Sequence, residues 1–332
     1  MTLSERRQGL LFIVIGPPGS GKNTLMKHVL SHSDNLSQLA TATTRPPRAG
    51  EQHGREHLFI DIPTFVRMIE TGELLEWQKI HSKQHYYGIP RGVVEDAIQN
   101  GHDLIADVEV LGATYIRSRY PNNSVLVFIK PPTLEALAQR MRDRGDSEEE
   151  IANRLKRVPT EMAFAPLCDY TIVNDLVDLA AAELLEIVQR ERARCGRGEA
   201  PLRITSFAAV VPMYDGDVLL PDSSLARLPL ASGEIPHQAV LSYLQASLGI
   251  ETSSDLLARP GESPFEGSFL PPSAINVQDH GDAKTVLFTY VYLLPKRIPA
   301  PLGWSYVPFA AADLDSDVIA AVRALAEPAA SG

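Results

Sequence analysis

A glycine-rich turn near the amino terminus constrains the fold of this chain more than any other stretch. It spans residues 16–24 and reads Gly-Pro-Pro-Gly-Ser-Gly-Lys-Asn-Thr. The apolar run 10–15 before it is short and rich in β-branched residues, which predicts a buried strand of a parallel sheet. Residues 25–30 after it have the spacing of an amphipathic helix. The sequence therefore predicts a strand, a tight loop and a helix in immediate succession.

This loop has the composition of a binding site for the phosphates of a nucleotide. Its glycines let successive backbone N–H groups face one anion at a helix N-terminus, and Lys22 adds a positive charge. A hydroxyl for Mg²⁺ usually follows the lysine, and Asn23 stands there with Thr24 next. An Asn oxygen can also bind Mg²⁺. We expect phosphate binding by the following residues: Gly16, Gly19, Ser20, Gly21, Lys22, Asn23 and Thr24.

The bulk properties of the chain exclude several classes of protein. A length of 332 residues suggests two domains, and 44% hydrophobic with 22% charged residues is ordinary for a soluble globular protein. We find no membrane-length apolar run and no signal sequence, and expect a cytoplasmic protein without a membrane partner. The net charge of −10 argues against nucleic-acid binding. Cys168 and Cys195 are far apart, which argues against a disulfide or zinc site.

Two arginines follow the first predicted helix in a stiff setting. Arg45 and Arg48 are separated by two prolines, which forbid a regular helix. The forked donors of two arginines in an extended segment can clamp one phosphate group. A solvated basic loop is the alternative interpretation of these residues alone.

Further along, predicted strands alternate with predicted helices, as in a parallel α/β sheet. The run 104–109 is a buried strand whose end carries Asp107 and Glu109, where open sheets of this class place their ligands. We also expect a strand over 125–129 and a helix that starts after Thr133. Helices are expected over 64–70 and 93–99. The pair Val158-Pro159 is expected to bend or end the helix that follows Arg154.

Together these motifs resemble the guanylate kinase family over about residues 9–192. The resemblance is carried by the glycine-rich loop, Thr-Thr-Arg45-Pro-Pro-Arg48-Ala-Gly-Glu51, Leu-Glu76-Trp, Tyr86-Tyr87-Gly88, Asp107-Val-Glu109-Val, the run 144–155 that begins with Arg144 and includes Arg154, and Tyr-Thr-Ile-Val-Asn174-Asp. It implies a P-loop kinase domain of residues 1–195 with a parallel sheet. A GMP-binding subdomain would be inserted at about 40–92, and a lid would span about 140–158.

The resemblance also implies a role for individual residues. Arg45, Arg48 and Tyr87 would bind the phosphate of GMP, and Glu76 would accept hydrogen bonds from the guanine. The implied GMP site is completed by Thr41, Glu51, His57, Asp107 and Glu109. ATP would bind the glycine-rich loop, with Asn174 near its adenine, and Mg²⁺ would lie near Asn23 and Asp107. The residues implied in phosphoryl transfer are Lys22, Arg45, Arg144 and Arg154.

Some positions depart from the family pattern and leave alternatives open. His57 replaces a tyrosine, Ile89 replaces a Ser or Thr that touches the base, and Leu111 replaces a glutamine. One alternative is a kinase for another small phosphate acceptor, such as ribose 1,5-bisphosphate. Another is a non-catalytic guanylate-kinase-like module that binds proteins, although the intact Lys22 argues against it. The lid arginines alone also fit a salt-bridged solvent face.

The remainder of the chain changes character after a linker at 196–202. The domain expected over 203–332 has strands at 204–213 and 218–220 around an Asp-Gly hairpin turn. A helix over 236–248 is expected to stop at Gly249. A long β-rich run at 285–294 and a final helix at 318–325 follow.

This α+β pattern resembles the Nudix family in one feature. Gly233-Glu234 precedes a helix that ends Leu248-Gly249-Ile250. The positions that bind Mg²⁺ in that family are here Ser242, Tyr243, Ala246 and Ser247. Without carboxylates there, hydrolysis of a diphosphate is not expected. We expect a degenerate Nudix-like domain with a structural, ligand-sensing or dimerising role, and an unrelated α+β domain is the alternative. A homodimer would form through it.

Overall fold

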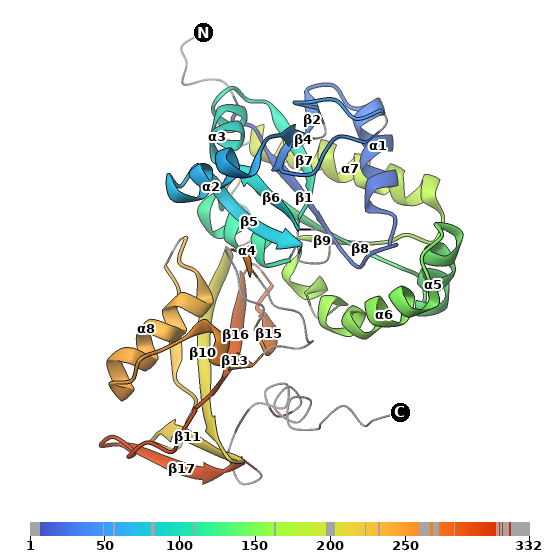
Figure 1. The fold of residues 1–332 in the computed structure, drawn as a ribbon. Helices are drawn as coiled ribbons and strands as arrows, with labels where there is room; N and C mark the ends of the chain where they lie inside the picture. Colours follow the sequence, from blue (N-terminus) through green and yellow to red (C-terminus); the bar gives the residue numbers. More distant parts are fainter. Residues whose placement is uncertain are drawn as a thin grey trace. The chain divides into compact units, whose positions relative to one another are not determined.

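The structure of the chain is a computed structural model, and it divides into two compact units. The first comprises residues 1–202 with 266–268, and the second comprises residues 203–265 and 269–332. The structure describes residues 7–48, 50–55, 57–80, 84–108, 110–162, 164–196, 203–222, 224–231, 233–258, 266–267, 272–281, 283–309, 312, 314 and 319. Figure 1 labels the main elements of both units.

A five-stranded parallel sheet forms the centre of the first unit, in the order β2-β7-β1-β8-β9. Its strands are β1 (Leu11–Ile15), β2 (Leu36–Gln38), β7 (Asp103–Asp107), β8 (Ser124–Lys130) and β9 (Tyr170–Val173). Every residue of β1 is buried, because helices cover both faces of the sheet. The parallel sheet predicted from the sequence is therefore confirmed.

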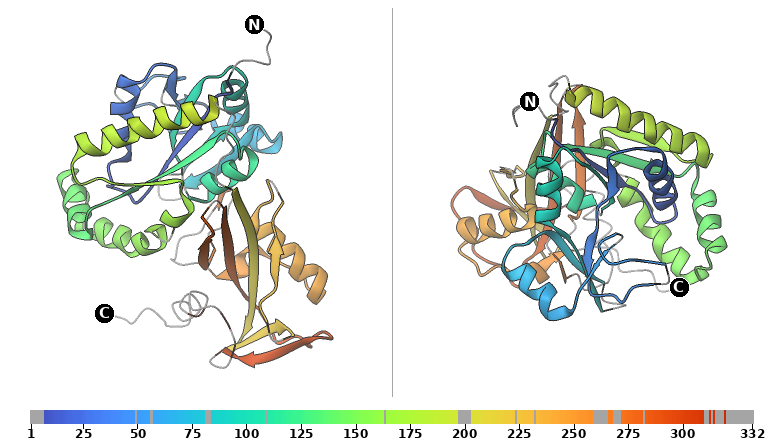
Figure 2. Two further views of the ribbon diagram at one scale, coloured as in Figure 1. Left: turned by 180° about the vertical axis from the view of Figure 1, so that it is seen from behind. Right: turned by 90° about the horizontal axis from the view of Figure 1, so that it is seen from above.

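Helices connect these strands and cover both faces of the sheet. They are α1 (Lys22–His32), α3 (Arg91–Gln99), α4 (Val110–Arg119), α5 (Leu134–Asp143), α6 (Glu148–Met162), the 3₁₀ turn η2 (Ala165–Leu167) and α7 (Val177–Gly196). Phe12 and Val14 pack with α1 and α7 in one cluster. Figure 2 shows the long α7 running across this side of the sheet.

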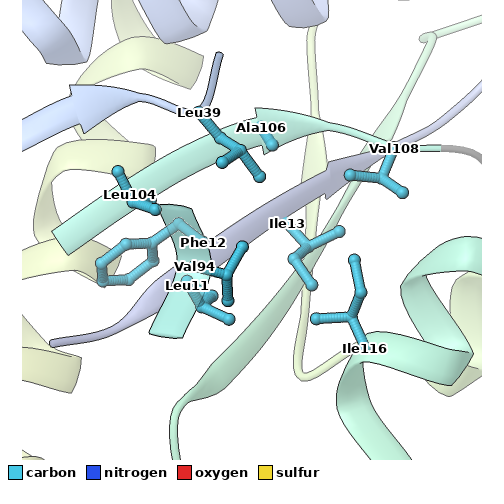
Figure 3. A pocket seen from close by; sticks show the side chains of 9 residues that line it. All are labelled: Leu11, Phe12, Ile13, Leu39, Val94, Leu104, Ala106, Val108 and Ile116. Atoms are coloured by element: carbon cyan, nitrogen blue, oxygen red, sulfur yellow. The ribbon is translucent and has the colours of Figure 1, made fainter. Parts of the chain in front are cut away.

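The opposite face of the sheet meets α3 and α4. Figure 3 shows the small cavity there, which is lined by nine side chains, namely Leu11, Phe12, Ile13, Leu39, Val94, Leu104, Ala106, Val108 and Ile116. All nine are apolar, so this cavity belongs to the core and offers a charged nucleotide no polar partner. Sheets of this class bind their ligands at the carboxyl ends of the strands, and the candidate nucleotide site lies there.

A second sheet of the first unit has the order β14-β5-β6-β3-β4. Its elements are β3 (Thr41–Thr43), β4 (His57–Phe59), α2 (Ile62–Glu70), β5 (Leu74–Ile80), β6 (His85–Pro90) and the two-residue β14 (Glu266–Gly267). β3 and β4 are parallel, and the other pairs are antiparallel. α2 starts at Ile62, before the expected Thr64, because the Asp61 side chain caps its first turn. This subdomain is inserted between β2 and α3.

The second unit contains a mixed seven-stranded sheet, with the path β13-β16-β10-β11-β17 and β12 and β15 alongside. Its elements are β10 (Arg203–Tyr214), β11 (Asp217–Pro221), β12 (Arg227–Pro229), α8 (Pro236–Leu248), η3 (Ser254–Leu256), β13 (Leu257–Ala258), β15 (Ala274–Asp279), β16 (Ala283–Leu293) and β17 (Trp304–Pro308). β10 and β16 are parallel along their whole length, and α8 packs on both. Positive φ angles at Asp215 and Gly216 form the expected hairpin turn.

Two helices end at other positions than the sequence predicts or end beside residues that are not described. An end of the helix at Val158-Pro159 is wrong, because α6 continues through Pro159 to Met162. Val158 is only 1% exposed and packs with Met141 and Ile151, so its burial offsets the hydrogen bond that proline removes. α7 ends at Gly196, and the rest of the expected linker, 197–202, lies outside the described residues.

The expected final helix at 318–325 also lies outside the described residues, except for Ile319. Of the helices that the structure describes, none combines the length and the apolar composition that crossing a bilayer requires.

Candidate active site

The glycine-rich loop joins β1 to α1 and adopts a conformation that requires glycine. Gly16 has φ +145°, and a Cβ on it would lie 2.3 Å from the carbonyl oxygen of Ile129. Gly21, the residue before α1, has φ +94°, and a Cβ there would lie 2.2 Å from Nδ2 of Asn174. Both glycines therefore let the loop lie directly against the sheet. The predicted strand–loop–helix unit is confirmed.

Lys22 holds its charge inside this loop. Its Nζ donates to the carbonyl oxygens of Gly16, at 2.5 Å, and Pro17, at 3.4 Å. The same Nζ lies 3.7 Å from Oδ1 of Asp107, the last residue of β7. The Lys22 side chain is 12% exposed and that of Asp107 is 39% exposed. The ammonium group and an accessible carboxylate thus meet where β1 and β7 end, the usual ligand edge of such a sheet.

Asn174, which follows β9, holds the glycine-rich loop in place by a hydrogen bond. Its Nδ2 donates to the carbonyl oxygen of Ser20 at 2.7 Å, and its backbone N–H donates to Lys130 at 2.8 Å. Arg140 in turn donates to the carbonyl oxygen of Asn174 at 2.9 Å. Asn174 is 1% exposed, and its Oδ1 has no hydrogen-bond partner among the described residues. Asn174 therefore fixes the loop backbone, and its side chain is enclosed by protein.

An ion pair organises the arginine-bearing segment. Arg45 donates to both carboxylate oxygens of Glu51, at 2.8 and 2.9 Å, and the backbone N–H of Arg48 donates to the same carboxylate at 2.7 Å. The hydrogen bonds from Arg45 and Arg48 lower the pKa of Glu51 to about 2. The bond to Glu51 also raises the pKa of Arg45 above its usual value, with a smaller contribution from Tyr87. The Arg48 side chain is exposed beside this pair.

Three further side chains come from the strands around Arg45. Thr41 on β3 faces His57 on the neighbouring β4, and Oγ1 and Nδ1 are 2.7 Å apart. The His57 ring lies edge-on to Tyr87 on β6, with centroids 6.2 Å apart. The structure therefore gathers these residues near the Arg45–Glu51 pair, in a cluster with hydroxyl, imidazole and guanidinium groups.

Glu76 points from β5 toward the first turn of α4. A Cβ placed on Gly112 would lie 2.3 Å from Oε2 of Glu76. Ile89, paired with Glu76 in the sheet, is 1% exposed and so belongs to the core. Leu111 also lies in the first turn of α4. Glu109 lies outside the described residues.

Arg144 and Arg154, which the sequence places in an expected lid, share one carboxylate. Asp146 accepts hydrogen bonds from Arg144 and, at 2.7 Å, from Nη1 of Arg154. Asp146 lies in the turn between α5 and α6, where Gly145 adopts φ +91°. The turn is closed by a bond from the Asp146 N–H to the carbonyl oxygen of Met141 at 3.1 Å. The two arginines are therefore ordered as a pair.

Three residues contribute to this geometry although the sequence motifs assign them no role. Asp146 stands between Arg144 and Arg154 in a short polar turn, and that acidic residue amid arginines is a signal. Gly112 lies in the first turn of a helix, where glycine is unfavourable without a specific cause. Arg140 is one of several arginines on α5, and only its tertiary contact with Asn174 distinguishes it.

Comparison with known proteins agrees with this geometry. The sequence model of the family described as guanylate kinase matches residues 8–191. A guanylate kinase of Symbiobacterium thermophilum is 40% identical over 201 residues, covering 60% of this chain and 94% of that protein. One of Caldanaerobacter subterraneus is 36% identical over 198 residues, covering 59% and 95%.

Among solved structures, the crystal structure of guanylate kinase from Anaplasma phagocytophilum is 26% identical, with a TM-score of 0.47 over 58% of this chain and 90% of that one. The family match spans the P-loop, the Arg45–Glu51 segment and the paired lid arginines within one continuous stretch. The chain described here therefore belongs to the guanylate kinase family.

Proposed function

We propose that the first unit transfers the γ-phosphoryl group of ATP to the phosphate of GMP, giving ADP and GDP. The observation that supports this most strongly is the presence of two phosphate-binding devices in one unit. One is the loop with Lys22, and the other is Arg45 fixed by Glu51. Such a transfer depends on positioning and charge neutralisation, and both devices supply these.

The donor side of the proposed site is the glycine-rich loop. Its backbone N–H groups and the N-terminus of α1 bind the phosphates of ATP, and Lys22 neutralises charge on the β- and γ-phosphates. The Nζ is already within the loop, bound to the carbonyl oxygen of Gly16. Asn174 serves ATP binding by holding the carbonyl oxygen of Ser20, which keeps the loop in its binding conformation.

Mg²⁺ accompanies ATP in this proposal, and the side chains at the carboxyl edge of the sheet fit it. Asp107 offers an accessible carboxylate, and Asn23 and Thr24 offer exposed side-chain oxygens in the first turn of α1. Hard oxygen donors are the ligands that Mg²⁺ prefers, together with phosphates and water. Among the described residues, no group of three or more His, Cys, Asp or Glu could hold a metal ion. The ion supplies charge neutralisation on the transferred group.

The acceptor side is the cluster around Arg45. Glu51 orients the guanidinium group of Arg45, and the exposed Arg48 adds a second one for the GMP phosphate. Thr41, His57 and Tyr87 surround the same position with polar groups. Glu76 accepts hydrogen bonds from N1 and the exocyclic amine of guanine, which adenine cannot supply in the same pattern.

The lid completes the site. Arg144 and Arg154 act together on the charge that develops as the phosphoryl group moves, and Asp146 keeps the two guanidinium groups adjacent. Because two guanidinium groups share one carboxylate, the three side chains together keep a net positive charge. Their other N–H donors can point toward a phosphate. Closing of α5 and α6 over ATP would bring this charge to the γ-phosphate.

We assign the second unit a non-catalytic role and propose that it is a degenerate Nudix-like domain. The side chains of α8 support the non-catalytic role. Helix α8 carries Ser242, Tyr243, Ala246 and Ser247 where metal-binding residues would be needed, and Tyr243 packs against Trp304 with ring centroids 6.2 Å apart. The proposal includes a domain boundary at 196–202, a homodimer through this domain, and a cytoplasmic location. The mass of the full chain in solution tests the homodimer, and a monomer at every concentration overturns it.

A coupled ADP-release assay with a panel of acceptors tests the proposed reaction. The panel is GMP, dGMP, AMP, UMP and ribose 1,5-bisphosphate, each with ATP and Mg²⁺. The proposal predicts turnover with GMP well above that with AMP or UMP. Turnover with ribose 1,5-bisphosphate alone would show that the acceptor is this sugar phosphate and not GMP. No turnover with any acceptor would favour a binding module.

A further inference from the structure

Glu76 lies at an irregularity in its strand. Along β5 and β6, Leu74 pairs with Pro90 but Glu76 pairs with Ile89, so Leu75 is an extra residue in β5. Leu74 and Leu75 are both buried, at 7% and 4% exposure, although neighbours in a regular strand face opposite sides. Such a bulge changes the direction of the following side chain. The strand is therefore built to redirect Glu76.

The redirected carboxylate reaches Gly112 in the first turn of α4. A Cβ on Gly112 would lie 2.3 Å from Oε2 and 2.7 Å from Cδ of Glu76, and 3.1 Å from Cγ1 of Val108. Real Cβ atoms do not approach other atoms to 2.3 Å, so an alanine at this position and the observed Glu76 conformation are incompatible. The space that the carboxylate uses is the space that a side chain at 112 would fill.

Backbone conformation does not explain the glycine at 112, and among the described atoms a Cβ placed there would approach the Glu76 carboxylate most closely, ahead of Cγ1 of Val108. The φ of Gly112 lies outside the positive range that favours glycine, so the backbone conformation suits any residue. Glycine inside a helix costs about 1 kcal/mol of stability relative to alanine. The chain accepts this cost at a buried position, and the close approach of Glu76 is the contact there that requires it.

The position also suits a carboxylate electrostatically. The first turn of a helix carries partial positive charge, which favours an anion beside it. An ionised carboxylate has acceptor oxygens only, and two of them side by side match two adjacent N–H donors of a base. The contact with α4 therefore fixes the direction of the carboxylate that reading guanine requires.

We infer that Gly112 is a positioning residue for guanine selection, and that its missing side chain is what lets Glu76 face the base. The inference rests on the proposed role of Glu76 as the guanine ligand. Gly112 itself touches no substrate in this account. It acts through the carboxylate of Glu76. Replacing it should therefore change the KM for the acceptor and the preference for guanine, and should leave the KM for ATP unchanged.

The test is the steady-state kinetics of the full chain carrying Gly112→Ala, with ATP, GMP and inosine monophosphate. Inosine monophosphate lacks the exocyclic amine, so the ratio of its KM to that of GMP reports one hydrogen bond of Glu76. We expect the KM for GMP to rise about 10- to 100-fold, as for a lost bond to a charged group. The KM ratio should fall toward one, and the KM for ATP should not change.

Gly92→Ala is the matched control, because Gly92 also lies in a helix, α3, but no tertiary neighbour in the described part of the chain lies within 4 Å of its added Cβ. This variant should keep all three KM values. Glu76→Ala, alone and combined with Gly112→Ala, completes a double-mutant cycle. Since the double variant lacks the clashing carboxylate, adding Gly112→Ala to Glu76→Ala should change the KM for GMP no further.

The outcomes separate the inference from the proposal beneath it. A Glu76→Ala variant with unchanged KM for GMP overturns Glu76 as the guanine ligand. A raised KM in Glu76→Ala but not in Gly112→Ala, or additive effects in the double variant, overturns the role of Gly112. If Gly112→Ala alone does not fold, folding restored by Glu76→Ala supports the contact, and folding not restored overturns it.

Discussion

Arg45 and Glu51 are joined by two parallel hydrogen bonds of 2.8 and 2.9 Å. Arg45 is 7% exposed, and its guanidinium group lies 5.6 Å from the centre of the Phe59 ring. A guanidinium group that is held by two hydrogen bonds to one carboxylate keeps its remaining N–H donors in a fixed direction. In the proposed function this pair holds Arg45 ready for the phosphate of the acceptor.

Replacing the carboxylate of this pair tests that preparation. Glu51→Gln removes the charge and one of the two acceptors, so Arg45 should lose its fixed orientation. We expect the KM for GMP to rise about tenfold, equivalent to about 1.4 kcal/mol, with little change in the KM for ATP. Steady-state kinetics with each substrate varied gives both values. Glu183→Gln, an exposed change on α7, should leave both unchanged, and an equal rise in both KM values would contradict the account.

The same pair predicts a pH dependence of stability. Its hydrogen bonds from Arg45 and Arg48 lower the pKa of Glu51 from 4.5 to about 2. A lowered carboxyl pKa contributes stability above the unfolded value, and this contribution is lost as the pH falls through the folded value. The melting temperature of the wild type should therefore exceed that of Glu51→Gln above pH 4.5, and the difference should vanish near pH 2. A difference that grows on acidification would refute this.

Lys22 carries the charge of the phosphate loop. Lys22→Ala should abolish turnover, because no other side chain places a cation inside the loop in the described part of the chain. ADP release with saturating GMP and ATP measures this. Lys27→Ala changes an exposed lysine of the same helix and should retain wild-type turnover. Near-normal rates in Lys22→Ala would disprove the assignment of the donor site.

Asp146 should control the lid through its two arginines. In Asp146→Asn the shared negative charge is gone, so Arg144 and Arg154 repel each other and the pair loosens. We expect kcat to fall about tenfold while the KM for GMP stays constant, since the interaction lost belongs to the transition state. Asp143→Asn, which alters a carboxylate that accepts a hydrogen bond from Gln139 within α5, is the control. A change confined to the KM for GMP would exclude this role.

Local features of the fold could be predicted from the sequence. The loop after β1 requires glycine at Gly16 and Gly21, and its conformation follows from these residues and the lysine. The same holds for the turn at Asp215-Gly216 and for the cap of α5 by Thr133, whose Oγ1 accepts from Ala136 at 3.1 Å. In each case the residues that determine the geometry are neighbours in the chain.

Features that depend on distant residues could not be predicted. The bulge at Leu75 appears only once β5 and β6 are paired, and the contact of Glu76 with Gly112 joins residues from two elements. The pairing of β14 with β5 joins Glu266 to Lys79. Likewise α6 continues past Pro159 because Val158 is buried against α5. Tertiary packing decides each of these, and local sequence carries no signal for it.

The central claim is that the chain moves a phosphoryl group from ATP to GMP, and phosphorus NMR of the reaction mixture tests it most directly. With the full chain, Mg²⁺, ATP and GMP, the account predicts that the resonances of ADP and GDP grow together, one molecule of each per transfer. Growth of ADP with inorganic phosphate in place of GDP, or an unchanged spectrum, would contradict it.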